Sequence, residues 1–292
     1  MNIANEVISL LYFHHNRGGY VKELLTLLVF VLPVSRLVSI SYDAEAVWNE
    51  RSSYGKEGSR LDLARAFHDL GQLTCHLWSI DSLLVMVPYA PFFGIAASFD
   101  DEIHRHYYCH AHHKNLHTHS KSLYEMSDIL VGLTLGTLAA CSFSHDERLQ
   151  RTAQLYAISL PLTWGFKSLI KKIGWDGNCR PLNEWFEQKK VYGGFPSGHM
   201  LEMMYATVLF GLEIGIGAFV PLAVNTAVVA VSFLKYNRHY ASQLVAGAAL
   251  GTAIGYAAHH ALEYNPQNCP ISFSVQPGCE KNCLMICGKC RF

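Results

Sequence analysis

Seven long apolar stretches, separated by polar segments, constrain the fold of this chain more than any other feature of the sequence. A helix needs roughly 17 to 25 mostly apolar residues to cross the hydrocarbon core of a bilayer. A single stretch of this kind is typical of a buried helix in a soluble protein, but seven in one chain favour a multi-pass membrane protein. The stretches are Leu24–Ser41, Leu77–Ser98, Ile129–Ser144, Leu155–Ile170, Met200–Phe219, Pro221–Leu234 and Leu244–Leu262.

The bilayer also restricts the kind of structure that these stretches can form. Lipid offers no water to unpaired backbone groups, so we expect every crossing to be helical. The predicted fold class is all-α, a polytopic membrane helical bundle with a six-helix core and an additional N-terminal hydrophobic segment. Because no internal repeat or low-complexity linker divides the chain, we predict one membrane domain over residues 77–262. An extension over 1–76 precedes it and a Cys-rich polar tail over 263–292 follows it.

The charge of the chain bears on its partners. Lys plus Arg and Asp plus Glu number 23 each among 292 residues, and only 16% of the residues are charged. A balanced charge supplies no net field that would draw the chain to nucleic acid. The balanced charge therefore argues against nucleic-acid binding. The partner that the apolar stretches predict is the lipid bilayer.

Three polar patches lie at the ends of apolar stretches in the second half of the chain. They are Lys171–Pro181, Pro196–His199 and Asn237–Gln243. The first two share one loop, and the third lies two predicted helices further along. All three are therefore expected on the same face of the membrane, where a site between helices can form.

The first two patches carry groups that suit phosphate binding. Lys172 can bind a phosphate as a point charge, and Arg180 can bind two oxygens with its planar fork. The Pro-Ser-Gly-His segment opens a helix, whose free N–H groups and positive dipole end can hold an anion. Gly198 allows the backbone to approach closely, and Ser197 supplies a hydroxyl group.

Two histidines from different loops complete the candidate site. One imidazole can attack phosphorus while the other protonates the leaving oxygen, and His239 and His199 are the candidates for these roles. Gln243 follows His239 by four residues, which places both on one helical face. Its side chain can therefore hydrogen-bond one ring nitrogen of His239 and fix the tautomer.

The order of these motifs resembles that of the type 2 phosphatidic acid phosphatase (PAP2) superfamily. The family pattern is Lys-x6-Arg-Pro, then Pro-Ser-Gly-His, then Ser-Arg-x5-His-x3-Asp, and the middle motif is intact here. The resemblance covers roughly residues 77–262 and implies a six-helix membrane phosphatase that needs no metal or other cofactor. It further implies a phosphohistidine formed on His239, protonation of the leaving group by His199, and phosphate binding by Lys172, Arg180, Ser197 and Gly198.

The sequence departs from the family pattern at three places. Lys172 and Arg180 are one residue further apart than in the family. Phe233 stands where the third motif has its phosphate-binding Arg, and Arg238 is the candidate to replace it. Gln243 stands in the position of the family Asp, as it does in the glucose-6-phosphatases, an active branch of the superfamily. These departures leave open a non-catalytic homologue that binds a phosphorylated lipid or a partner protein.

Two further clusters admit other interpretations. Seven histidines lie between His104 and His119, a density that fits a metal-dependent membrane lipid oxidase with histidine boxes, or a solvated loop with no metal site. Five cysteines between Cys269 and Cys290 can form disulfides or a zinc site, or remain reduced thiols. The interpretation that the motifs favour is a multi-pass membrane phosphatase acting on a phosphomonoester or pyrophosphate, of a lipid in particular.

Overall fold

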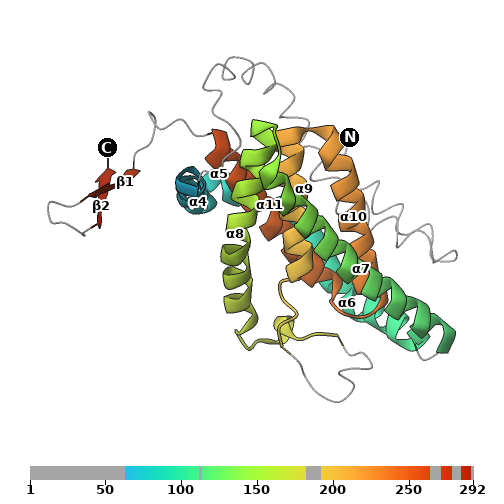
Figure 1. Ribbon diagram of the computed structural model, residues 1–292. Helices are drawn as coiled ribbons and strands as arrows, with labels where there is room; N and C mark the ends of the chain where they lie inside the picture. The colour runs from blue at the N-terminus through green and yellow to red at the C-terminus, as the bar shows by residue number, and fades with distance from the viewer. Residues whose placement is uncertain (1–62, 112–113, 182–191, 264–270, 278–283, 291–292) are drawn as a thin grey trace, which may run out of the picture.

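The computed structural model describes residues 63–111, 114–181, 192–263, 271–277 and 284–290 (Figure 1). Within these residues the chain forms a bundle of α-helices and one short antiparallel hairpin. The helices are α4 (Leu63–Leu77), α5 (Ile80–Leu84), α6 (Tyr89–Ala111), α7 (Lys114–Ala140), α8 (Glu147–Lys171), α9 (Gly198–Ile214), α10 (Ile216–Lys235) and α11 (Ala241–Glu263). The hairpin pairs β1 (Ile271–Pro277) with β2 (Leu284–Cys290), so that Ile271 lies opposite Cys290.

The six long helices α6 to α11 overlap six of the seven predicted apolar stretches, although α6 and α7 extend well beyond the stretches Leu77–Ser98 and Ile129–Ser144. The predicted all-α class is therefore confirmed for the bundle, while the hairpin lies in the predicted polar tail. The remaining stretch, Leu24–Ser41, lies outside the described residues. α4 belongs to the predicted N-terminal extension, yet it packs against α8 and α11 and buries Leu73 completely.

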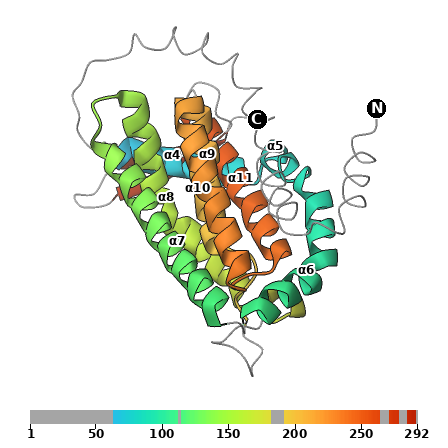
Figure 2. The same ribbon diagram turned by 90° about the vertical axis from the view of Figure 1, so that its right-hand side faces the viewer.

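α9 and α11 form the centre of the bundle (Figure 2). Nearly every residue of α9 from Met200 to Leu212 is buried, because α8, α10 and α11 all contact this helix. α11 can approach α9 closely because Gly247, Gly251 and Gly255 face it. Small residues at such an interface bring the backbones together without side chains between them.

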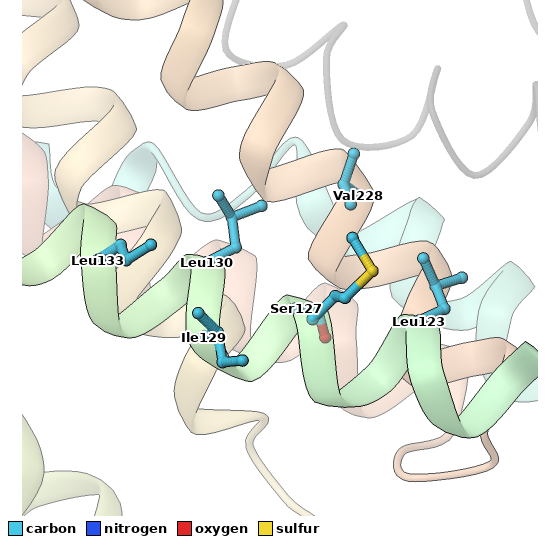
Figure 3. A pocket seen from close by; sticks show the side chains of 7 residues that line it. Leu123, Ser127, Ile129, Leu130, Leu133 and Val228 are labelled. Carbon is cyan, nitrogen blue, oxygen red and sulfur yellow. The ribbon is translucent and has the colours of Figure 1, made fainter.

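Among the described residues, three segments are long and apolar enough to cross a membrane: Ile80–His106, Ser122–Phe143 and Ile216–Lys235. Their outward faces expose large apolar side chains, such as Ile129 and Leu133 of α7, each 63% exposed. Between α7 and α10 lies an apolar groove of about 250 Å³ (Figure 3). We call it the α7–α10 groove; it is lined by Leu123, Met126, Ser127, Ile129, Leu130, Leu133 and Val228.

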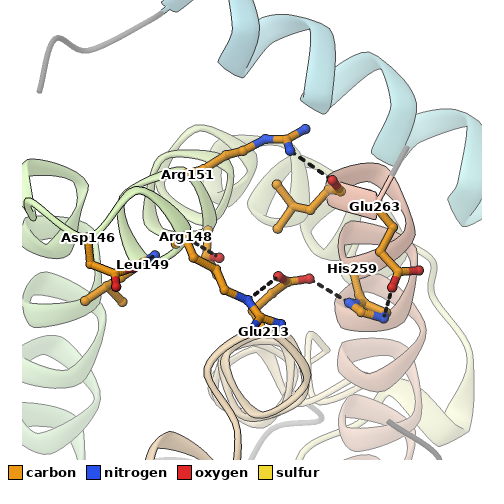
Figure 4. A network of polar contacts seen from close by, with 9 residues as sticks. Asp146, Arg148, Leu149, Arg151, Glu213, His259 and Glu263 are labelled. Carbon is orange, nitrogen blue, oxygen red and sulfur yellow. Dashed lines mark hydrogen bonds and ion pairs between the residues drawn. The ribbon is translucent and has the colours of Figure 1, made fainter. Parts of the chain in front are cut away.

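Charged side chains inside the bundle meet at the end where α8 begins and α9 and α11 finish (Figure 4). The Glu213 carboxylate lies 2.6 Å from Nδ1 of His259 and 3.4 Å from Nε of Arg148. Nearby, Arg151 donates two 2.9 Å hydrogen bonds to Asp69 of α4 and a third to the Leu262 carbonyl. These contacts fix α4 to the bundle and compensate the buried charges.

Candidate active site

The three predicted polar patches meet at the opposite end of the bundle. α8 and α10 finish there, and α9 and α11 begin there, because consecutive helices run in opposite directions (Figure 1). The structure thus brings together the end of α8, the start of α9 and the 236–240 connection into α11. The predicted placement of the patches on one face agrees with this topology.

Asn178 holds the loop between α8 and α9 in shape. Its side-chain amide donates to the carbonyls of Lys171 (2.9 Å) and Ile173 (2.6 Å) at the end of α8. Its Oδ1 atom accepts from the backbone N–H groups of Gly193 (3.2 Å) and Phe195 (2.9 Å). One buried side chain therefore joins the end of α8 to the residues that precede the Pro-Ser-Gly-His motif.

The Pro-Ser-Gly-His motif forms the start of α9, as predicted, with Ser197 at the N-cap. The Ser197 N–H donates to the Gln243 carbonyl at 3.0 Å, while its buried hydroxyl finds no hydrogen-bond partner among the described residues. Gly198 packs against Lys167, whose side chain would lie only 3.0 Å from a Cβ at this position. Lys167 is also paired with Glu202, one turn further along α9.

Gln243 fixes the tautomer of His239. Its Nε2 group donates to the carbonyls of Gly177 (3.1 Å) and Cys179 (2.6 Å), so the Oε1 atom must be the acceptor on the other side. Oε1 lies 3.2 Å from both the Tyr240 N–H and Nδ1 of His239. Nδ1 therefore carries the ring proton, and Nε2 of His239 keeps a lone pair that can attack an electrophile.

α6 contributes to the position of these residues from outside the three motifs. Its Asp100 carboxylate accepts hydrogen bonds from the Ser242 N–H (3.1 Å) and the Ser242 hydroxyl (2.5 Å). Asp100 thus caps the first turn of α11, which carries Gln243. A carboxylate at a helix N-terminus satisfies free N–H groups and complements the helix dipole.

Basic side chains surround His239. Burial, followed by the positive charge of Arg238, lowers the pKa of Arg180 to about 10. Burial, followed by the charges of Arg180 and Lys167, lowers the pKa of Lys171 to about 8. Burial, with Arg180 and Lys171 next in importance, also holds the pKa of His239 well below its ordinary value. His239 is therefore neutral at pH 7, and the clustered positive charge favours an anion.

Phe233 contacts both candidate catalytic histidines. Its ring centroid lies 5.3 Å from that of His199, edge-on, and 5.7 Å from that of His239, tilted. Phe233 is completely buried and fills the place that the family pattern gives to an Arg. Arg238 lies nearby, because its N–H donates to the Phe233 carbonyl and its own carbonyl accepts from Arg180.

At this end of the bundle, seven of the eight predicted site residues interact with one another or with shared neighbours. The exception is Lys172, which is exposed at the C-cap of α8. Lys171 interacts with the basic cluster instead, since it lies one helical turn after Lys167 on the same face. The two lysines are neighbours in sequence, so sequence spacing alone favours neither strongly.

Lys171→Ala is therefore expected to weaken substrate binding more than Lys172→Ala does. Loss of one partly buried cation from this cluster of basic side chains should raise KM for a phosphorylated substrate roughly tenfold. The exposed Lys172 provides a matched control, and its removal should change KM less than about twofold. Steady-state kinetics of both variants test this expectation, and equal effects, or a larger effect at Lys172, would contradict it.

Several residues of the site escape the motifs. Lys167 and Asp128 contact motif residues from outside the three patches, and Glu202 pairs with Lys167; Asn178 lies within the first patch, but no motif singles it out. The only signal in the sequence is their charge or polarity within or beside apolar stretches, where such groups are costly.

The histidine cluster 104–119 and the cysteine cluster 269–290 lie mostly outside the residues whose side chains the structure describes. Side chains from 107 to 121 and in the tail hairpin are not described, so the metal-oxidase interpretation and the cysteine pairing remain predictions. Where side chains are described, no group of three His, Cys, Asp or Glu residues could hold a metal ion.

This combination defines a class of protein: an apolar helical bundle with two histidines, basic side chains and a helix N-terminus gathered at one end. Residues 163–267 match the family model of the PAP2 superfamily. The family consists mainly of phosphatases, and the match, together with three described segments of spanning length, supports a membrane protein. No curated protein and no solved structure matches the chain significantly.

Proposed function

We propose that the protein is a multi-pass membrane phosphatase that hydrolyses a phosphomonoester or a pyrophosphate, of a lipid, through a phosphohistidine. The observation that carries this proposal is the hydrogen bonding of His239. Gln243 holds the ring proton on Nδ1 and leaves Nε2 with a lone pair that can attack an electrophile. Neutral imidazole beside clustered cations is the arrangement that attack on a phosphate requires.

In the first step, Nε2 of His239 attacks phosphorus and the bond from phosphorus to the leaving oxygen breaks. Lys171, Arg180 and Arg238 hold the negative oxygens, together with the free N–H groups at the start of α9. His199 donates its proton to the leaving oxygen, so that an alcohol or a phosphate departs. The phosphoryl group is then attached to His239.

In the second step, His199 accepts a proton from water, and the resulting hydroxide attacks phosphorus. The bond between phosphorus and His239 breaks, which releases inorganic phosphate and restores the neutral imidazole. Ser197 can donate its hydroxyl to a phosphate oxygen during both steps, since this buried group has no partner among the described residues. The charges that the reaction needs all come from protein side chains and the helix terminus.

The α7–α10 groove supports a lipid as the substrate. Ser127 lines this groove and accepts a 2.7 Å hydrogen bond from the Ser232 hydroxyl, next to Phe233 in the chain (Figure 3). This hydrogen bond links the groove to α10 one residue before Phe233, whose ring contacts both histidines. A hydrocarbon chain in the groove would keep its phosphate at the end of the bundle where the cations lie.

Phe233 favours one alternative, a homologue that binds a phosphorylated lipid without hydrolysing it. A phenyl ring supplies no hydrogen bond to a phosphate oxygen, and loss of one such donor can lower a rate by about 10²–10³-fold. Arg238 compensates for this loss in the proposal. The alternative instead predicts binding of a phosphate analogue without turnover.

The proposal is tested by phosphate release from the protein purified in detergent. Phosphatidic acid, lysophosphatidic acid, a polyprenyl pyrophosphate and the soluble 4-nitrophenyl phosphate should be compared. We expect release that vanadate inhibits and that a metal chelator leaves unchanged. Vanadate binding without release from any substrate would favour the non-catalytic homologue, and loss of activity with chelator would favour a metal site.

A further inference from the structure

We propose that Asp128 of α7 is a positioning residue that orients His199 and favours its protonated form for transfer of a proton to the leaving group. This inference rests on the proposed phosphatase reaction. It assigns a role to a helix that lies outside the stretch matched by the family model. It also gives the second histidine a carboxylate partner, as Gln243 serves the first.

The geometry places the Asp128 carboxylate against the imidazole of His199. Oδ1 of Asp128 lies 3.9 Å from Nε2 of His199, within ion-pair distance. This oxygen is itself enclosed, and it has no hydrogen-bond partner among the described residues. The histidine ring packs on its other side against Phe233, whose edge-on contact restricts its rotation. With Nε2 directed at Asp128, Nδ1 of His199 is the nitrogen that exchanges a proton with substrate.

Asp128 also lies where a carboxylate requires a specific reason. It falls within Ser122–Phe143, a segment apolar enough to cross a membrane, and ionisable groups there are costly unless paired or functional. The three buried carboxylates among the described residues are paired with cations: Asp69 with Arg151, Glu202 with Lys167, and Glu213 with Arg148 and His259. Asp128 is only partly buried; its recorded ion-pair partner is His199, and its side chain also hydrogen-bonds Tyr124, one turn earlier on α7.

The charges around His199 explain why it needs this partner. Lys167 and Lys171 face it from α8, Glu202 lies on its own helix, and His239 lies on the far side of Phe233. Glu202, which also pairs with Lys167, favours the protonated form of His199, as Asp128 does, whereas Lys167 and Lys171 oppose it. Burial lowers the pKa of His199, and the nearby carboxylates act in the opposite direction. Loss of Asp128 would therefore lower the pKa of His199 further and reduce the fraction of protonated imidazole.

Two substrates distinguish proton transfer from a merely structural role. An alkyl phosphate needs a proton on its leaving oxygen, whereas 4-nitrophenolate leaves readily without one. We expect Asp128→Asn to lower kcat for an alkyl phosphate roughly tenfold or more, with KM little changed. The same variant should hydrolyse 4-nitrophenyl phosphate at a rate within about twofold of the wild type. Equal losses on both substrates would overturn the proposal.

Two further variants sharpen the comparison. Asp128→Glu keeps the carboxylate and should restore part of the rate on the alkyl phosphate. Glu125→Gln removes an exposed carboxylate one turn earlier on α7 and should leave both rates unchanged. A loss at Glu125 equal to that at Asp128 would assign the effect to the overall charge of α7 and would contradict a specific role for Asp128.

Titration of His199 tests the contact without any turnover. In protein labelled with ¹⁵N-histidine, the His199 signal is assigned from its absence in His199→Gln. We expect its pKa to be lower in Asp128→Asn than in the wild type, and an unchanged pKa would overturn the inference. A wild type that releases no phosphate would instead refute the proposed function, with the His199 pKa still reporting whether the two residues interact.

Discussion

Replacement of His239 by alanine should lower the rate of phosphate release at least about 10³-fold, because no other group can take over the attack on phosphorus. The effect should appear in kcat, since the cations that bind the substrate remain. Incubation of the wild type with ³²P-labelled substrate, followed by a rapid quench, should yield acid-labile radioactivity on the protein. The alanine variant should yield none.

The control for this prediction is His145→Ala. His145 is exposed before the start of α8, at the opposite end of the bundle, so its loss should leave the rate unchanged. Size-exclusion chromatography should show that both variants elute as the wild type does. Substantial turnover by His239→Ala, in a correctly folded preparation, would show that His239 is not the nucleophile.

Replacement of Gly251 by alanine should destabilise the bundle by about 2–3 kcal/mol. A Cβ at this position would lie 2.4 Å from the Leu201 carbonyl oxygen and 2.8 Å from Cβ of Met204. Most of this obstruction comes from the backbone and first side-chain atoms of α9, so α11 must move away. Unfolding in detergent, followed by circular dichroism against denaturant concentration, measures the loss.

Gly132→Ala is the matched control for the glycine substitution. Gly132 lies in the interior of α7, and a Cβ there would meet nothing within 4 Å. The exchange should be neutral or slightly stabilising, because alanine favours a helix more than glycine does. Equal stability of the two variants would mean that α9 and α11 are not packed as closely as the structure shows.

The sequence predicts the helices of the bundle well because one physical requirement produces them. Helices that pack together or face lipid must be apolar over most of their length, and α6 to α11 carry that signal directly. α4 could not be predicted as part of the bundle in the same way. It is joined to α8 by Asp69 and Arg151, and no local pattern reveals that two charges distant in sequence will meet.

In the candidate site, too, the sequence predicts what local spacing determines and misses what depends on tertiary structure. The relation between His239 and Gln243 follows from helical spacing, since residues four apart share a face. The second function of Gln243, which binds the carbonyls of Gly177 and Cys179, depends on how the α8–α9 loop folds back. The choice of Lys171 over Lys172 depends on the direction in which the last turn of α8 faces. Both features of the site depend on tertiary contacts, which cannot be read from a single sequence.

The cap that Asp100 places on α11 has a consequence for any attempt to isolate the catalytic machinery. The carboxylate belongs to α6, so the helix that orients the nucleophile is completed by a residue more than 60 positions before the matched stretch 163–267 begins. A fragment cut to the boundaries of the recognised domain would start α11 with bare amide groups and would lack the aspartate that faces His199. A fragment that keeps this cap therefore has to extend back at least through α6.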